Sequence, residues 1–172
     1  MIKRFGPTDI KLRLYFRFNN SKGRYKTEDL ASDYNTKVRN MQRHIKYLID
    51  HGLIKSSTYR ASNAEFCVDK VMAPQYSSEL KDDSVLRLIY LYYSFEESKE
   101  FKTWYELGDV SDEYSIESLA SILGVCNATI ENDLHYLKRY KLIGMRRISG
   151  SKNIYKIGRK NPTKAYMKGS NK

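Results

Sequence analysis

The sequence predicts a mainly α-helical protein with small β-hairpins, an α+β fold in which two similar units follow one another in tandem. The tripeptide "LAS" at Leu30–Ser32 recurs 89 residues later at Leu119–Ser121. After each copy, apolar residues recur at a spacing of three and four, which is typical of a helix that buries one stripe. Two short runs of strand-like composition follow each of these helices and predict a hairpin.

The two copies stay in register well beyond the tripeptide. When the sequence is shifted by 89 residues, apolar and aromatic side chains fall on one another across about 25 positions. The matched pairs are Met41 with Ile130, Ile45 with Leu134, Tyr47 with Tyr136, Leu48 with Leu137, Leu53 with Leu142, and Ile54 with Ile143. A register held this far indicates an internal duplication.

Each copy predicts a short helix, a tight break and a longer helix. Thr27 and Ser115 stand where an N-cap residue belongs, and an acidic residue follows each of them in the first helical turn. Gly52 is well placed as a left-handed residue at the end of the first long helix. The breaks are predicted at 34–36 and 124–126, the long helices at 37–51 and 127–140, and the hairpins at 53–60 with 65–69 and at 142–148 with 153–158.

The stretch "IKLRLYFRF", residues 10–18, alternates apolar and polar side chains as a strand does. The repeat favours a helix instead, because "LRLYFRF" from Leu12 matches "LRLIYLY" from Leu86. The second stretch follows Asp82, Asp83 and Ser84, an acidic start with a capping residue. We therefore expect both stretches to be helical.

These elements divide the chain into four parts. We expect a first unit at 8–69, a linker at 70–83, a second unit at 84–158 and a basic flexible tail at 159–172. The second unit contains an acidic insertion at 96–113 without a counterpart in the first. Its Phe101, Trp104 and Tyr105 suggest a lid over the core, with a patch that binds a protein partner as the alternative.

The charge pattern points to a polyanionic partner. The formal charge is +11, from 31 Lys and Arg against 20 Asp and Glu. Residues 1–69 carry +7, residues 70–113 carry −5, residues 114–158 carry +4, and residues 159–172 carry +5. Two basic blocks separated by an acidic segment make nucleic acid the expected partner.

Other classes of protein lack their signatures. Cys67 and Cys126 have no Cys or His at ligand spacing, so the sequence predicts two reduced structural thiols, no disulfide and no metal site. The three histidines form no cluster around a tyrosine nucleophile and no Gly-rich phosphate loop is present, so we expect neither an enzyme nor a cofactor. The longest apolar run, "LIYLYY", is too short for a membrane span, and a cytoplasmic protein is expected.

The order of a helix, a capped short helix, a turn, a longer helix and a hairpin resembles the winged helix-turn-helix. The stretches "YKTEDLASDYNTKVRNMQRHIKYLIDHGLI" and "YSIESLASILGVCNATIENDLHYLKRYKLIGMRR" carry the resemblance. The second stretch is the closer match, whereas the first has Asp33, Tyr34 and Asn35 where an apolar residue and Gly are usual. The resemblance implies that the longer helix of each unit enters the major groove of DNA.

In the first unit the long helix predicts a basic outer face. Val38, Met41, Ile45 and Leu48 would face inward. Arg and Gln can contact guanine and adenine edges, and Lys can contact phosphates. The residues expected to contact DNA are Lys37, Arg39, Asn40, Gln42, Arg43 and Lys46; a solvated helix face without function is the alternative.

The corresponding face of the second unit predicts weaker binding. It offers Asn127, Thr129, Asn132 and His135, together with the carboxylates of Glu131 and Asp133. Either a carboxylate accepts from a cytosine amino group, or the helix binds weakly and its wing contributes more. That wing carries the basic residues Arg146, Arg147, Lys152 and Lys156. We expect unequal halves, with the first unit dominating base recognition.

Two such units in one chain resemble the internal-dimer DNA-binding proteins of conjugative plasmids, and also plasmid replication initiators. The resemblance implies a sequence-specific regulator of transcription or an accessory factor of DNA transfer, acting as a monomer whose two units contact successive turns of the duplex. A replication initiator and a winged-helix protein–protein adaptor are the alternatives.

Overall fold

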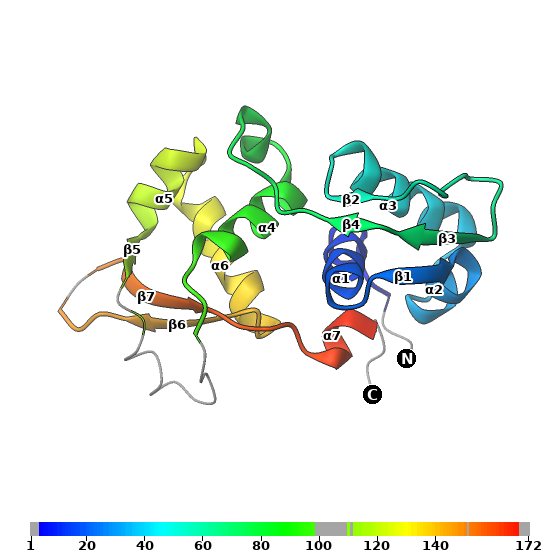
Figure 1. The fold of residues 1–172 in the computed structure, drawn as a ribbon. Coiled ribbons are helices and arrows are strands. Elements are labelled where there is room, and N and C mark those ends of the chain that lie inside the picture. Colours follow the sequence, from blue (N-terminus) through cyan, green and yellow to red (C-terminus); the bar gives the residue numbers. More distant parts are fainter. Residues whose placement is uncertain (1–3, 99–109, 111, 151, 169–172) are drawn as a thin grey trace. The chain divides into compact units, whose positions relative to one another are not determined.

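The computed structural model describes residues 4–98, 110, 112–150 and 152–168, and it combines α-helices with small antiparallel sheets, which confirms the α+β class. The chain forms two compact units (Figure 1). Unit 1 comprises Met1–Pro74 together with Thr163–Lys172, and unit 2 comprises Gln75–Pro162.

Unit 1 begins with a helix and a strand, continues with two helices, and ends with short strands and a C-terminal helix. Strand β1 pairs with β3, and β2 pairs with β4, both antiparallel. The elements are α1 (Pro7–Asn20), β1 (Gly23–Lys26), α2 (Thr27–Asp33), α3 (Val38–Asp50), β2 (Ile54–Lys55), β3 (Glu65–Val68), β4 (Lys70–Val71) and α7 (Lys164–Lys168).

Unit 2 repeats this order after a short 3-10 helix. Its three strands form one antiparallel sheet in the order β5, β7, β6. The elements are η1 (Ser78–Lys81), α4 (Ser84–Ser94), β5 (Glu113–Ser115), α5 (Ile116–Leu123), α6 (Asn127–Arg139), β6 (Ile143–Arg147) and β7 (Ile154–Arg159).

The helical prediction for residues 10–18 is confirmed by α1. Leu12, Leu14, Tyr15 and Phe18 have no exposed surface, so side chains on several faces of α1 are buried. A helix that is covered on most sides loses the single apolar stripe of an amphipathic helix. This explains why its sequence imitates a strand.

The turns before and after the long helices have matching backbone conformations. Asn35 (φ 48°) and Gly124 (φ 67°) are left-handed and lie 89 residues apart. Gly52 (φ 68°) is left-handed as predicted, and its counterpart Lys141 (φ 58°) is too. Asn is among the residues that tolerate this conformation best, so the first unit makes its turn without glycine.

Of the two predicted N-caps, one is confirmed. The Ser115 hydroxyl accepts a hydrogen bond from the Ser118 amide (3.4 Å). Thr27 is instead the first residue of α2, and its buried hydroxyl has no partner among the described residues. The prediction for Thr27 is wrong because the helix begins one residue earlier than the cap requires.

The hairpin of unit 2 is confirmed, because β6 and β7 pair antiparallel. Ile143 lies opposite Arg159 at one end of the pairing, and Arg147 lies opposite Tyr155 at the other. The hairpin of unit 1 is wrong in detail, because β2 has only two residues and pairs with β4, whereas β3 pairs with β1. Strands β1 and β5 were not predicted. They have four and three residues, and strands this short show no alternation of their own.

The tail is the largest correction. Residues 159–172 were expected to be flexible, yet Arg159 ends β7 and α7 packs against α1, the red and dark blue helices in Figure 1. Arg13 donates from Nη1 to the Tyr166 carbonyl (2.9 Å), and the Tyr34 hydroxyl donates to the Met167 carbonyl. Two buried side chains in five, Tyr166 and Met167, suffice because the surface that receives them is already formed. The predicted lid residues Phe101, Trp104 and Tyr105 lie outside the described residues.

Candidate nucleic-acid interface

Helix α3 is anchored in unit 1 by a narrow apolar stripe. Met41, Ile45 and Leu48 have no exposed surface, as predicted. Val38 was also expected to face inward, but 40 % of it is exposed. It is the first residue of α3, one turn before the helix meets the core, and this prediction is wrong.

His44 is an inward-facing residue of α3 that the sequence analysis missed. It is 8 % exposed. Burial, reinforced by the positive charge of Lys11, lowers the pKa of His44 to about 4. The imidazole is therefore neutral at pH 7 and adds no charge to the helix.

The opposite face of α3 presents cations to solvent. Lys37, Arg39, Asn40, Arg43 and Lys46 are all exposed. Arg39 and Arg43 form no ion pair with any described residue, so both guanidinium groups remain available to a ligand. Lys46 contacts Asp50 (2.6 Å), but both side chains are more than half exposed, and such surface pairs contribute little.

Gln42 is held by the loop that follows β2. Its Nε2 donates to the Ala61 carbonyl (2.9 Å), and the Tyr59 hydroxyl donates to the Gln42 carbonyl (3.2 Å). Gln42 was predicted to contact a base, but its amide fastens this loop, which contains the turn of the predicted hairpin, against α3. The same loop carries Arg60, an exposed cation that the sequence analysis did not single out.

A polar hollow of about 470 Å³ lies at the start of α3. It is lined by Lys37 and Asn40 of the predicted face, by Asn35 and Thr36 of the turn, and by Arg4. The exposed Arg4 precedes α1 and was missed, because only the folded chain brings residues 4 and 37 together. These groups extend the cationic surface beyond α3.

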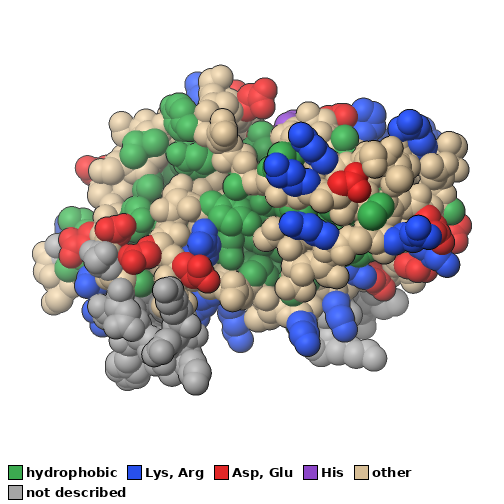
Figure 2. Space-filling model, viewed as in Figure 1, with side chains coloured by type: hydrophobic (Ala, Val, Ile, Leu, Met, Phe, Trp, Pro, Cys, Tyr) green, Lys and Arg blue, Asp and Glu red, His purple; other side chains and the backbone are tan. Residues whose placement is uncertain are grey.

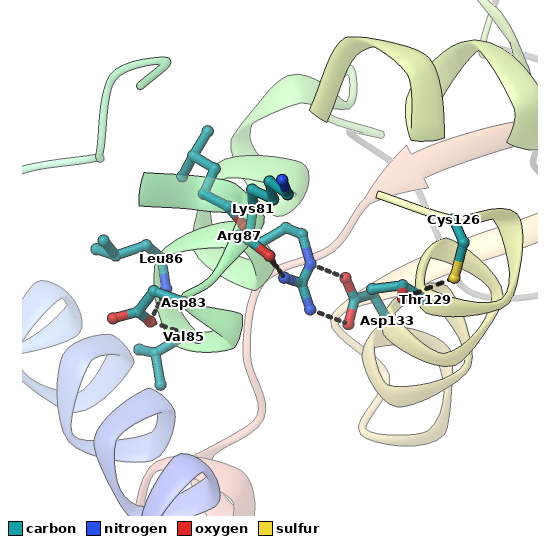
Figure 3. Close-up of polar contacts among 9 residues, drawn as sticks. Lys81, Asp83, Val85, Leu86, Arg87, Cys126, Thr129 and Asp133 are labelled. Carbon is teal, nitrogen blue, oxygen red and sulfur yellow. Dashed lines mark hydrogen bonds and ion pairs between the residues drawn. The ribbon is translucent and has the colours of Figure 1, made fainter. Parts of the chain in front are cut away.

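In unit 2 the structure removes a predicted contact residue from the surface. Asp133 was placed on the outer face of α6, yet it is 7 % exposed and faces α4 (Figure 3). Arg87 donates from Nε to Oδ2 of Asp133 and from Nη2 to Oδ1 (3.4 Å). The Arg87 Nη1 also donates to the carbonyls of Leu80 and Lys81, both at 3.1 Å. Burial raises the pKa of Asp133, and the Arg87 charge opposes that shift.

The remaining predicted residues of α6 lie at the surface. Asn127, Glu131, Asn132 and His135 are exposed, and Thr129 is half-buried with its hydroxyl 3.2 Å from the Cys126 sulfur. That hydrogen bond lowers the pKa of the exposed Cys126 thiol. Helix α6 therefore offers polar groups and one carboxylate where α3 offers cations.

The β6–β7 hairpin carries the basic residues predicted for the wing of unit 2. Arg146, Arg147 and Lys152 are exposed near its turn, as predicted, and Lys156 is half-buried. Lys156 lies opposite Glu113 of β5 in the sheet. The hairpin therefore keeps three exposed cations at its free end.

Net charge divides sharply between the units. Unit 1 contains 18 Lys and Arg against 7 Asp and Glu, and unit 2 contains 13 of each. The whole formal charge of +11 therefore belongs to unit 1. Figure 2 shows several Lys and Arg side chains of unit 1 on the face drawn, in blue.

No protein-family model and no curated protein matches this chain. Among the helices that the structure describes, none is both long and apolar enough to cross a membrane. The described residues also contain no group of three His, Cys, Asp or Glu side chains arranged to hold a metal ion.

Proposed function

We propose that this chain is a sequence-specific double-stranded DNA-binding protein without catalytic activity, built from two winged helix-turn-helix units. The repeated order of helix, strand, two helices and further strands in units 1 and 2 supports this architecture. The left-handed residues Asn35 and Gly124 support it as well, because they stand at matching positions in the turn between the paired helices.

The cationic outer face of α3 carries the proposal. A B-DNA major groove is about 12 Å wide and admits one helix. Helix α3 is held by a buried stripe on one side and presents Arg39, Asn40 and Arg43 on the other. The two arginines would contact guanine edges, Asn40 an adenine edge, and the flanking Lys37 and Lys46 the phosphates.

Unit 2 contributes less to base recognition in this proposal. Burial of Asp133 leaves Glu131 as the carboxylate of the predicted α6 face, but no Lys or Arg lies among the residues predicted to contact DNA there. The hairpin cations Arg146, Arg147 and Lys152 would contact the backbone or a narrow minor groove. On the resemblance to the internal-dimer proteins, we propose a role in transcription control or DNA transfer of a mobile element such as a conjugative plasmid.

The test is selection of duplexes from a random pool, followed by dissociation constants from fluorescence anisotropy at fixed salt. Arg39→Glu with Arg43→Glu should weaken binding at least about 30-fold, since each specific contact contributes about 1–3 kcal/mol. Ala128→Glu with Asn132→Glu, at the matching positions of α6, should weaken it less than about tenfold.

The control is Lys22→Glu with Lys70→Glu. Both lysines are exposed cations of unit 1 outside α3, and their reversal changes the net charge equally. A loss of affinity for the α3 pair no larger than for this control would contradict the proposal. Circular dichroism of each variant verifies that it is folded.

A further inference from the structure

The polar hollow beside α3 is bordered by the segment that precedes α1, and we name it the Arg4 hollow. Its volume is about 470 Å³, and its lining residues are Arg4, Phe5, Asn35, Thr36, Lys37 and Asn40. These residues include two cations, two amides and a hydroxyl, and none of them is a carboxylate. The hollow therefore offers positive charge and hydrogen-bond donors to an anionic ligand.

Both cations of the Arg4 hollow keep their charge available. Arg4 and Lys37 are exposed, and neither forms an ion pair with a described residue. Other surface cations of unit 1 do have such a partner, since Arg24 (3.8 Å) and Lys26 (3.6 Å) share Glu65. Two positive charges on the walls of one hollow repel each other, and an anion bound between them would remove that repulsion.

Phe5 holds Arg4 beside the turn between α2 and α3. The Phe5 ring lies edge-on to the Tyr34 ring, with centroids 6.5 Å apart. The Arg13 guanidinium lies over the Phe5 ring, 4.3 Å from its centroid. Tyr34 and Arg13 are both buried, so Phe5 is attached to the core of unit 1. Because Arg4 directly precedes Phe5, its backbone is held near the turn while its side chain stays exposed.

The turn that forms the other wall is fixed by hydrogen bonds. The Thr36 amide donates to the Ala31 carbonyl (2.9 Å). Tyr34, two residues before Thr36, has no exposed surface, and its hydroxyl donates to the Met167 carbonyl of α7. A site whose walls are in place before the ligand arrives loses little conformational freedom on binding.

Unit 2 also places a cation beside the matching turn, but from a different position in the sequence. Gly124 is the counterpart of Asn35, and the Lys81 side chain of η1 lies beside it. When "LRLYFRF" is aligned with "LRLIYLY", Arg4 falls on Ser78 and not on Lys81. The placement is shared although the residues are not, which favours a role for the charge over a by-product of the duplication.

We propose that the Arg4 hollow binds one phosphate group of the DNA backbone, with Arg4 and Lys37 as its two cations. This inference rests on the proposed DNA binding and adds to it a residue that precedes the repeated scaffold. Lys37 directly precedes α3, so a phosphate held here fixes the position of α3 in the major groove. Phosphate contacts carry no sequence information, and base recognition stays with Arg39 and Arg43.

The test is the salt dependence of duplex binding, measured by fluorescence anisotropy on the selected duplex. The logarithm of the association constant falls linearly with that of the salt concentration, with a slope of about −0.9 for each phosphate neutralised. Arg4→Ala should make the slope less negative by about 0.9 and should weaken binding about tenfold at low salt. A duplex of scrambled sequence should show the same loss, because a phosphate contact is independent of sequence.

Two further variants test the positioning role of Phe5 and the specificity of the effect. Phe5→Ala removes the ring that holds Arg4 and leaves the charge. It should shift the slope in the same direction, and Arg4→Ala should then have less effect than in the wild type. The control Lys22→Ala removes an exposed cation of unit 1 that does not line the hollow, and it should leave the slope unchanged. Circular dichroism verifies that each variant is folded.

The salt slope separates failure of this inference from failure of the proposed function. A wild-type chain that selects no duplex overturns the proposed function and this inference with it. A wild type that binds its selected duplex, with a slope that Arg4→Ala changes no more than Lys22→Ala does, overturns this inference alone.

Discussion

Units 1 and 2 have the same order of helices and strands, and they differ in how each neutralises a buried arginine. Arg13 of α1 and Arg87 of α4 occupy matching places in "LRLYFRF" and "LRLIYLY", and both are buried. Arg87 is paired with Asp133 of α6. At the position 89 residues before Asp133, unit 1 has the neutral His44.

Arg13 therefore uses partners of another kind. It pairs with Asp9 one turn away in α1 (3.0 Å) and lies over the rings of Phe5 and Tyr166. Its donation to the Tyr166 carbonyl brings α7, from the far end of the sequence, into unit 1. The comparison teaches that a duplicated scaffold tolerates different partners for the same cation, provided that the cation is neutralised.

The surfaces of the units have diverged further than their cores. Unit 1 keeps all of the net charge and an outer α3 face of cations, whereas unit 2 is neutral and has a mainly apolar groove of about 450 Å³ between α4, α5 and its sheet. A surface position can change at a cost within about 0.5 kcal/mol, whereas a core position cannot. Separate roles in the two units are therefore accessible without loss of the fold.

The largest effect is expected at the buried pair of unit 2. Asp133→Asn leaves the Arg87 cation buried without a counter-charge and should destabilise folding by about 3–5 kcal/mol. Urea denaturation followed by circular dichroism measures this loss. Asp9→Asn in unit 1 should cost less, because Arg13 retains its contacts with two aromatic rings. Equal losses of stability for the two substitutions would contradict the different neutralisation of Arg87 and Arg13.

A pH-dependent effect of intermediate size is expected from His44. Its pKa is about 4 in the folded chain and about 6.5 in the unfolded chain. Between these values the unfolded state binds a proton that the folded state does not, so stability should fall as pH decreases from 6.5 to 4. Thermal melting across this range should depend less on pH in His44→Gln. His135→Gln, at an exposed site in α6, should retain the wild-type slope.

The smallest effect is expected at Gln42. Gln42→Ala removes the hydrogen bond to Ala61 and frees the loop that carries Arg60, which should weaken DNA binding by about 1 kcal/mol, roughly fivefold. Glu131 is the corresponding residue of unit 2, and Glu131→Ala should leave affinity unchanged or slightly higher, because it removes a carboxylate. Anisotropy on the selected duplex measures both; an effect of Glu131→Ala equal to that of Gln42→Ala would show that the units contribute alike.

The sequence predicted the three main helices of each unit, α1 to α3 and α4 to α6, and the outward position of the α3 cations; it missed α7. Met41, Ile45 and Leu48 mark the buried side of α3 by their spacing alone, so Arg39 and Arg43 had to face away. Helix α1 was found through its match with α4, although its own alternation suggested a strand. The hairpin of unit 2 followed from strand-like residues on both sides of a turn.

Contacts between distant residues were beyond the reach of the same patterns. Asp133 looks like a surface residue of α6 until Arg87, 46 positions earlier, is placed against it. Residues 164–168 look like part of a polar tail until α1 supplies a surface for Tyr166 and Met167. The Gln42 amide looks free until the loop with Ala61 folds back.

The sequence by itself determined the three main helices of each unit, the duplication of the unit and the cationic face of one helix, because periodicity, turns and charge are local properties of a chain. The tertiary structure alone decided the partner of each buried charge, the pairing of β1 with β3 and the position of the apolar groove in unit 2. Those features depend on groups that meet only after folding, and burial sets both the cost of an unpaired charge and the gain from a covered apolar side chain.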